Sequence, residues 1–379
     1  MDKNIRKELM VNIPVSNNIE NMDSFNVPKL EKIPNIRVTV PGSKSMTNRA
    51  LLLAALAEGK TGLSGVAFSE DSRIFIKALQ DLGFEVLVDE ENKKVNVTGL
   101  GGKIPKKEAS IYVASAGTAS RFLTAFTALS GSKIKIDSSE QMKKRPMEEL
   151  YEVLESIGIS VEKREKDDKN SDFIKNDNDI ETCEFKDNKV NENDKNTVSN
   201  FPIIVDGSGL TNEKEISINL NIDRSSQFLS ALLMVLPLYF DKINIHLTGN
   251  RKAKSYVIMT EKMMIEFGFS GQITKESEND YIITGGSYSG RDYNVEPDVS
   301  AACYFYALAA ITGGSIIVNY VKKDSLQGDL KFLDVLKNMG CEIIYDDEII
   351  VKGPEGGALK GITVSMSDFS DQALTLAAI

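Results

Sequence analysis

A sequence pattern that recurs about every 73 residues limits the folds open to this chain of 379 residues. Four segments carry an amphipathic helix pattern, then a glycine, then a short apolar run, and their glycines are Gly83, Gly158, Gly268 and Gly340. Glycine is typical of the left-handed position that follows a helix, so each segment predicts a helix that ends at the glycine. The even spacing indicates one supersecondary unit repeated along the chain.

One spacing is longer than the others because a polar insert interrupts the second unit. Residues 165–200 are rich in Asp, Glu, Lys and Asn and poor in apolar residues. Such a segment cannot bury enough apolar surface to order itself. We therefore predict that it is disordered and dispensable for folding and for ligand binding. Without it, the period of the repeat is restored.

A second series of helix starts keeps the same period. These starts lie near Ser45, Thr118, Ser225, Val299 and Asp371. Each such helix is followed by an apolar strand flanked by glycine, so each unit predicts the order β-α-β-α-β-β. Alternation of helices with strands places the chain in the mixed α/β class.

Composition excludes several classes of protein. The chain has 45 Lys and Arg against 55 Asp and Glu, a formal net charge of −10, which argues against a nucleic-acid-binding protein. Its longest nearly uncharged apolar run, residues 228–240, is too short to span a bilayer, and residues 1–10 lack the apolar core of a signal peptide. Cys183, Cys303 and Cys341 are far apart, which favours free thiols in a reducing compartment such as the cytoplasm.

The single histidine, His246, limits the possible chemistry. One histidine and three scattered cysteines cannot build a His-rich zinc site. His246 lies in an alternating run that predicts a strand, where we expect a structural role. Proton transfer in this protein must therefore depend mainly on carboxylates, lysines or tyrosine.

Residues that can bind anions stand at the first predicted helix start. Ser43 or Ser45 can cap the helix, Lys44 stands beside its positive end, and Arg49 lies one turn after Ser45 on the same face. The glycine spacing of a P-loop is absent. A capped surface helix with two solvated cations is the simpler alternative, and the spacing alone does not separate the two interpretations.

Similar residues recur at the next helix starts. Gly117 lets a ligand approach the backbone, Arg121 follows one turn later, and Arg145 precedes a helix start at Pro146. Residues 223–228 are a hydroxyl-rich start to a strongly apolar helix. Each of these alone is explained by an ordinary helix cap. A repeat that aims several of them towards one region favours a site for a polyanion.

The later helix starts carry acids instead of cations. Asp298 and Asp371 occupy equivalent positions in the repeat. An aspartate at a helix start is most often a cap. Two acids that face several cations across a cleft would instead suit a polyanionic substrate with a proton to remove.

Seven motifs stand in a fixed order along the chain. They are Pro-Gly-Ser-Lys-Ser-Met-Thr-Asn-Arg-Ala from Pro41, Ala-Gly-Thr-Ala from Ala116, Lys-Arg-Pro-Met from Lys144, Ser-Ser-Gln-Phe-Leu-Ser-Ala-Leu-Leu-Met from Ser225, Lys-Ser-Tyr from Lys254, Glu-Pro-Asp-Val-Ser-Ala-Ala from Glu296 and Asp-Phe-Ser-Asp-Gln-Ala from Asp368. The series resembles the signature of the EPSP synthases, the 3-phosphoshikimate 1-carboxyvinyltransferases of the shikimate pathway. The resemblance covers roughly residues 35–379 apart from the insert.

The resemblance implies a fold of two similar domains, each an inside-out α/β barrel, or prism, of three β-α-β-α-β-β units, with the substrate cleft between them. Residues 43–295 would form one complete domain, and residues 1–42 with 296–379 a second domain that is incomplete at its C-terminus. The family has further motifs, a lysine-glutamate pair in a segment ending Asp-Arg and an Asp-His-Arg segment. These would lie beyond Ile379, in roughly 100 more residues.

The resemblance also implies a reaction. Phosphoenolpyruvate gives its enolpyruvyl group to the 5-hydroxyl of shikimate 3-phosphate, and phosphate leaves after addition and elimination. No metal ion, organic cofactor, nucleic acid or membrane is implied, and we expect a monomer.

Residue roles carried over from the resemblance fall into three sets. The expected shikimate 3-phosphate ligands are Lys44, Ser45, Arg49, Ser225, Ser226, Gln227, Tyr256 and Asp371. The expected phosphoenolpyruvate ligands are Lys44, Gly117, Arg121 and Arg145. Asp371 resembles the base near the 5-hydroxyl, and Lys44 the catalytic lysine that meets both substrates. The chain departs from the family pattern at Ser115, Gln141 and Ala253, where many members have asparagine, arginine and serine.

Two alternatives stay open at this point. A UDP-N-acetylglucosamine enolpyruvyl transferase would need Gly-Ala-Lys-Asn near its start and a reactive cysteine in a basic loop. This chain has Gly-Ser-Lys-Ser from Gly42, and residues 141–146 contain no cysteine. A non-catalytic anion-binding fragment or pseudoenzyme of the same fold is the other alternative, and continuation of the reading frame past Ile379 would discriminate it.

Overall fold

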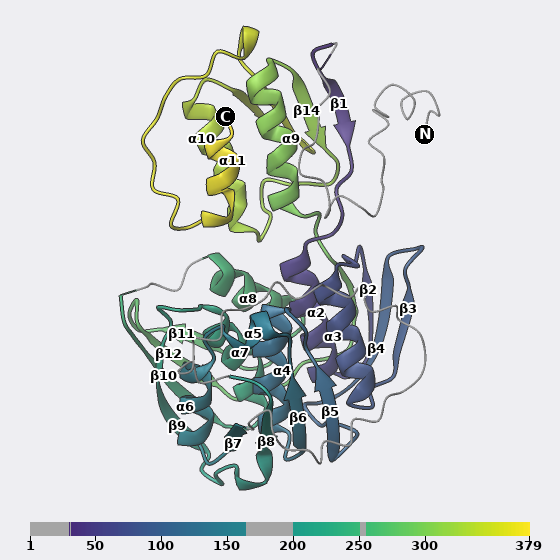
Figure 1. Ribbon diagram of the computed structural model, residues 1–379, viewed down its shortest axis with the longest axis vertical. Coiled ribbons are helices and arrows are strands. Elements are labelled where there is room, and N and C mark those ends of the chain that lie inside the picture. Colours follow the sequence, from purple (N-terminus) through teal and green to yellow (C-terminus); the bar gives the residue numbers. More distant parts are fainter. Residues whose placement is uncertain (1–29, 31, 164–199, 251–254) are drawn as a thin grey trace, which may run out of the picture.

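Two bodies of unequal size make up the described chain, which comprises residue 30 and residues 32–163, 200–250 and 255–379 of a computed structural model. The polar insert up to residue 199, and Cys183 within it, fall outside the described residues. Figure 1 shows the larger body below the smaller one, with the chain passing between them twice. The two passages lie side by side, since Gly42 and Pro297 form an antiparallel bridge.

Three four-stranded sheets form the outside of the lower body. In spatial order their strands are β13 (Asp292–Asn294), β2 (Glu58–Ser64), β4 (Lys94–Leu100) and β3 (Val86–Asp89); β5 (Glu108–Tyr112), β6 (Lys133–Asp137), β8 (Ile203–Asp206) and β7 (Ser160–Lys163); and β9 (Glu215–Asn221), β10 (Lys242–Thr248), β12 (Asp280–Thr284) and β11 (Ile273–Lys275). The first pair in each sheet is parallel and the other pairs are antiparallel. The sheets are therefore three copies of one unit.

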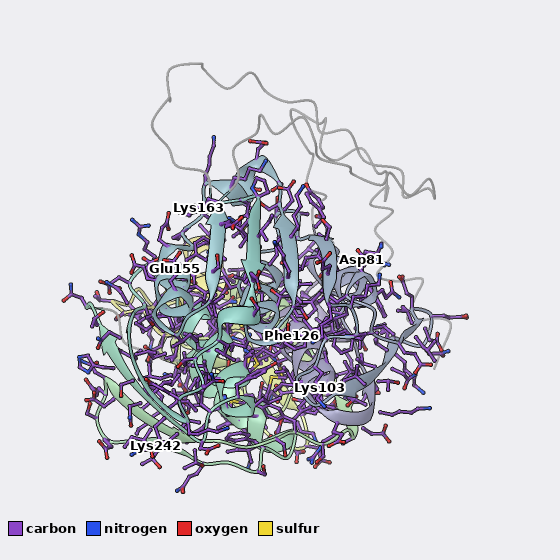
Figure 2. All side chains as sticks on the ribbon, turned by 90° about the horizontal axis from the view of Figure 1, so that it is seen from below. Asp81, Lys103, Phe126, Glu155, Lys163 and Lys242 are labelled. Carbon is purple, nitrogen blue, oxygen red and sulfur yellow. The ribbon has the colours of Figure 1, made fainter. Side chains whose placement is uncertain are left out.

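Helices pack inside the three sheets of the lower body, and some of them keep one face exposed. They are α2 (Lys44–Leu56), α3 (Glu70–Asp81), α4 (Gly117–Leu129), the short α5 (Glu140–Lys143), α6 (Glu148–Ser156), α7 (Gln227–Val235) and α8 (Ser255–Glu266). Along α2, α4 and α7 nearly every side chain is buried, which places these three helices in the core. Strand β9 alternates buried with exposed residues, so its sheet covers the helices with one face. In Figure 2, Phe126 of α4 lies near the centre and Lys242 of β10 near the edge.

The upper body repeats the same unit once. Its sheet has the order β1 (Asn35–Val38), β14 (Ser315–Val318), β16 (Ile349–Lys352) and β15 (Glu342–Tyr345), and its helices are α9 (Val299–Thr312), α10 (Phe332–Asn338) and α11 (Ala373–Ala377). Two 3-10 turns, Gly328–Lys331 and Ser370–Gln372, precede α10 and α11. The buried apolar residues of this body form a cluster separate from that of the lower body.

The predicted helix boundaries are confirmed at most positions. Gly83, Gly158, Gly268 and Gly340 have φ values of 97°, 91°, 71° and 108°, the left-handed conformation expected after a helix. The second series of helices begins at Lys44, Gly117, Gln227 and Val299, and the fifth start is the 3-10 turn from Ser370. The largest shift from the expected starts is two residues, at α7.

Two of the four units are not continuous in sequence. Strand β1 precedes α2 in the chain, yet it pairs in parallel with β14 of the upper sheet, Asn35 lying opposite Ser315. Strand β13 precedes α9 in the chain, yet it pairs with β2 of the lower body, Asp292 lying opposite Gly62. The two bodies have exchanged first strands, because the chain changes body between the first strand and the first helix of a unit.

His246 and the cysteines take structural positions. His246 is an exposed residue of β10, and its Nδ1 lies 2.7 Å from Oδ1 of Asp280 on the neighbouring strand β12. Cys303 and Cys341 are buried free thiols. The predicted strand at His246 is confirmed.

Asn200, at the end of the expected insert, belongs to the folded body. It is 4% exposed, and its Nδ2 donates to the Arg145 carbonyl at 3.0 Å. Its backbone nitrogen donates to the Lys143 carbonyl at 3.1 Å, and its own carbonyl accepts from the Tyr151 hydroxyl at 2.8 Å. These bonds link the residue that leads into β8 to the segment that carries Arg145.

Replacing residues 165–199 with a short Asn-Gly turn should leave the thermal midpoint nearly unchanged. Strands β7 and β8 pair with Lys163 opposite Ile203, so a short turn can join them. As a comparison, Asn200→Ala should lower the free energy of unfolding by about 1–3 kcal/mol, since it leaves buried polar groups unpaired. Denaturant unfolding measures both variants, and a large loss of stability in the deletion alone would contradict the prediction.

Candidate active site

The predicted cationic and acidic helix starts meet where the two bodies face each other. The backbone nitrogen of Lys44, at the start of α2, lies 3.4 Å from Oδ2 of Asp298 at the start of α9. The hydroxyl of Tyr256, in the first turn of α8, donates to Oδ2 of Asp371 at 2.5 Å. Lys44 and Tyr256 belong to the lower body and the two acids to the upper body. The interface therefore brings together residues more than 100 positions apart in sequence.

Two arginines and a glycine form a positively charged corner at the start of α4. A Cβ on Gly117 would lie 2.9 Å from Nη1 of Arg121 and 3.1 Å from Nη1 of Arg145, so a larger residue would displace both. Arg121 donates from Nη1 to the Gly117 carbonyl at 2.9 Å and to Oε1 of Gln227 at 3.2 Å. Its Nη2 donates to the Pro146 carbonyl at 3.0 Å. Each of these acceptors is a neutral oxygen.

The electrostatics of this corner favour an anion. Burial and the nearby charge of Arg145 lower the pKa of Arg121 to about 10. Arg121 is 5% exposed, and its Nε has no hydrogen-bond partner among the described residues. A negatively charged ligand would offset the repulsion between the two guanidinium groups and stabilise both in their charged form.

Arg49 lies inside the lower body, only 2% exposed. Its Nε donates to Oγ1 of Thr260 at 2.8 Å, its Nη1 to the Ser45 carbonyl at 3.0 Å and its Nη2 to the Tyr256 carbonyl at 3.3 Å. Nη2 also donates to Oγ of Ser230 at 3.4 Å. Burial lowers the pKa of Arg49 to about 10. In this arrangement Arg49 joins the start of α2 to the start of α8.

Lys44 is held by an acid from the next helix. Ser43, rather than Ser45, caps α2, because its Oγ accepts from the Met46 nitrogen at 3.5 Å. Nζ of Lys44 lies 2.9 Å from Oδ2 of Asp71 in the first turn of α3, and the lysine side chain is 50% exposed. An exposed ion pair of this kind is weak, so a multiply charged anion can compete with Asp71 for the ammonium.

Asp298 meets the starts of two helices. Its Oδ1 accepts from the Ala301 nitrogen at 3.0 Å, which confirms the interpretation of Asp298 as the cap of α9. Its Oδ2 faces the Lys44 nitrogen of α2. A single carboxylate thereby stabilises helix starts from both bodies.

Asp371 is an exposed carboxylate held by a tyrosine. Burial raises the pKa of Tyr256 far above its usual range, and the hydrogen bond to Asp371 adds to the effect. The phenol therefore stays protonated and donates, while the carboxylate accepts. One oxygen of Asp371 is fixed by this bond at the interface.

The start of α7 adds hydroxyl and amide groups. Oγ of Ser225 accepts from the Gln227 nitrogen at 3.2 Å, and Ser226 is the N-cap residue. Nε2 of Gln227 donates to Oγ1 of Thr118 at 3.4 Å. Gln227, the first residue of α7, thus connects this helix start to the corner formed by Gly117, Arg121 and Arg145. Ala253 falls outside the described residues.

Asp329, at the turn before α10, was not predicted. It is 7% exposed, and Oγ of Ser300 donates to its Oδ2. Burial raises the pKa of Asp329, the Ser300 hydrogen bond opposes this, and the carboxylates of Asp371 and Asp298 raise it further. An aspartate before a short helix carries the ordinary signal of a cap, so its burial had no sequence signal. Asp71, Thr260 and Ser230 were also not predicted, because polar residues inside a helix give no sequence signal of the partner they meet.

Neither a metal cluster nor a membrane helix is found in the part of the chain that the structure describes. No three His, Cys, Asp or Glu side chains among those residues lie close enough to share a metal ion. No described helix is long and apolar enough to cross a membrane.

Comparison with known proteins identifies the family. The family model of EPSP synthase (3-phosphoshikimate 1-carboxyvinyltransferase) matches residues 33–190 and 185–379. The 3-phosphoshikimate 1-carboxyvinyltransferase of Trichormus variabilis is 38% identical over 360 residues, which cover 94% of this chain and 76% of the relative. That of Vibrio atlanticus is 34% identical over 358 residues, covering 94% and 75%.

A solved structure shows the same fold. EPSP synthase from Acinetobacter baumannii matches with a TM-score of 0.68 at 22% identity, covering 91% of this chain and 71% of that chain. At this identity the likeness concerns the fold alone, and it confirms the predicted two-domain α/β class. Together with the family model and the curated relatives, the converging helix starts lead to one conclusion. The chain belongs to the EPSP synthase family, transferases of aromatic amino acid biosynthesis that move the enolpyruvyl group of phosphoenolpyruvate to the 5-hydroxyl of shikimate 3-phosphate.

Proposed function

We propose that this chain carries out the family reaction with the residues that line the starts of its helices. The observation that carries the proposal is the corner formed by Gly117, Arg121 and Arg145, where two guanidinium groups meet only neutral acceptors in the described structure. Phosphoenolpyruvate brings the required negative charge and binds there. Bidentate pairing of guanidinium with phosphate or carboxylate favours this ligand class.

Shikimate 3-phosphate binds at the starts of α2, α7 and α8 in this proposal. Its ligands are Lys44, Ser45, Arg49, Ser225, Ser226, Gln227, Tyr256 and Asp371. Arg49 acts mainly by positioning other ligands, because its guanidinium is buried and donates to the Ser45 and Tyr256 carbonyls. Gln227 reaches the arginine corner, so the two substrates bind next to each other.

Lys44 stands between the two anions and exchanges Asp71 for substrate oxygens. Asp371 takes the proton of the 5-hydroxyl as the oxygen attacks carbon 2 of phosphoenolpyruvate, and carbon 3 gains a proton from solvent. The tetrahedral intermediate then returns a proton from carbon 3 to solvent as the bond to phosphate breaks, and the proton held by Asp371 leaves with the phosphate. Fixed cations and a fixed base lower the barrier because they need no reorganisation during the reaction.

We propose further that the lower and upper bodies are domains of a monomer in a reducing compartment. Two separate apolar cores, and the two passages of the chain found among the described residues, support the division into residues 43–295 and residues 1–42 with 296–379. Cys303 and Cys341, buried and unpaired, support a reducing compartment.

Gly117→Ala should raise the KM for phosphoenolpyruvate by about tenfold and leave shikimate 3-phosphate binding unchanged. The added Cβ would push against both guanidinium groups, and a charged hydrogen bond contributes about this much. Gly361→Ala is the matched control, since a Cβ there meets nothing within 4 Å. Steady-state kinetics and calorimetry measure the two ligands separately. An unchanged KM for phosphoenolpyruvate would contradict the placement of this substrate.

Lys44→Met should reduce turnover roughly 100-fold or more without changing the thermal midpoint. The substitution removes a cation that lies beside a helix start and has only an exposed ion pair to lose. Lys77→Met is a suitable control, because Lys77 forms a similar exposed pair with Asp81 away from the interface. Near-normal turnover in Lys44→Met would exclude it from the site.

Asp371→Asn should lower the rate of phosphate release by about 10²- to 10⁴-fold when both substrates are present, while shikimate 3-phosphate still binds. The amide keeps an acceptor for Tyr256 but cannot take a proton. Asp334→Asn, an exposed acid of α10, serves as control. Equal phosphate release from Asp371→Asn and the parent would refute the role of Asp371 as the base. If the parent binds shikimate 3-phosphate but releases no phosphate, the non-catalytic alternative is favoured.

A further inference from the structure

Two cavities lie between the two bodies, beside the contacts that join them. A cavity of about 620 Å³ lies at the two chain passages, lined in part by Val40 and Pro297. A second cavity of about 630 Å³ lies beside the start of α8 and extends to Tyr345. Because the bodies do not touch at these cavities, the contacts beside the cavities set the distance between the two bodies.

One of these contacts adjoins the proposed base. Oγ of Ser255 donates to the Asp368 carbonyl at 2.8 Å. The next residue, Tyr256, donates to Asp371, three positions after Asp368. Two consecutive residues of the lower body thus meet one short segment of the upper body. Any shift of Ser255 relative to Asp368 also moves the Tyr256 hydroxyl relative to the Asp371 carboxylate.

A glycine makes this approach possible. A Cβ on Gly328 would lie 2.3 Å from Cβ of Ser255 and 2.8 Å from its Oγ, well inside van der Waals contact. Gly328 is not among the glycines with positive φ, so its backbone suits any residue. Space, and not backbone conformation, therefore calls for glycine at this position.

Hydrogen bonds on both sides of Gly328 prevent its segment from moving independently of the rest of the upper body. The neighbouring Gln327 is 6% exposed, its Oε1 accepts from the Val299 nitrogen at 3.0 Å, and its Nε2 donates to Glu296 at 3.0 Å. On the other side, Asp329 accepts from Ser300. A side chain at position 328 would consequently move the whole upper body away from α8.

We infer that Ser255 and Gly328 are positioning residues that set how closely the two bodies approach and thereby hold the Asp371 carboxylate at the Tyr256 hydroxyl. The inference rests on the proposed role of Asp371 as the base. It adds two residues that touch neither substrate in the proposed arrangement. A misplacement of about 1 Å at a reacting group is enough to cost about 100-fold in rate.

Gly328→Ala should therefore lower kcat by about 100-fold, with shikimate 3-phosphate binding within about twofold of the parent. X-ray scattering should give a larger radius of gyration, and the thermal midpoint should not change. Gly361→Ala, with open space around its Cβ, is the control. Ser255→Ala, which loses only the bond to Asp368, should lower kcat about two- to tenfold.

Combining Gly328→Ala with Ser255→Gly makes the decisive test. Removing Cβ of Ser255 makes room for the alanine, so the double variant should recover to the level of Ser255→Gly alone. Normal kcat in Gly328→Ala, or a double variant no better than Gly328→Ala, would overturn the inference. Failure of the proposed site is seen separately, as absence of shikimate 3-phosphate binding in the unsubstituted chain.

Discussion

Helices α2, α4 and α7 are buried on nearly every side, and most of their side chains are apolar. Burial of nearly all their side chains places them inside the lower body and leaves the sheets outside. Only the helix ends can then reach a ligand. Lys44, Gly117 and Gln227 stand at those ends, where the free backbone N–H groups of the helices favour anions. The proposed polyanion site is a consequence of how the core is built.

Much of this arrangement could be predicted from the sequence, because glycine and apolar periodicity have strong local signals. The left-handed glycines after helices and four of the helix starts lie within two residues of their expected positions. The pairing of β1 with β14 had no such signal. Spacing along the chain fixes the order of strands within a unit, but it does not say at which passage the chain changes body.

The site shows the same division between local and long-range information. Gly117, Arg121, Arg145 and Gln227 were expected near one another and do meet. Asp329 was not expected, because its burial depends on Ser300, which belongs to another helix. Short polar residues inside ordinary helices carry no periodic signal, and their partners become known only when distant segments are packed together.

The exchange of first strands determines the order in which strands can pair while the protein is synthesised. Strand β1 leaves the ribosome before every other described strand, yet its partner β14 lies 280 positions later, Asn35 opposite Ser315. At roughly 5 to 20 residues per second, β1 waits tens of seconds with both edges unpaired. The lower body meanwhile completes its last sheet only when β13 emerges, just before β14. The first of the described strands to be made is thus among the last to pair, and it depends on a nascent chain that does not capture its open edge elsewhere.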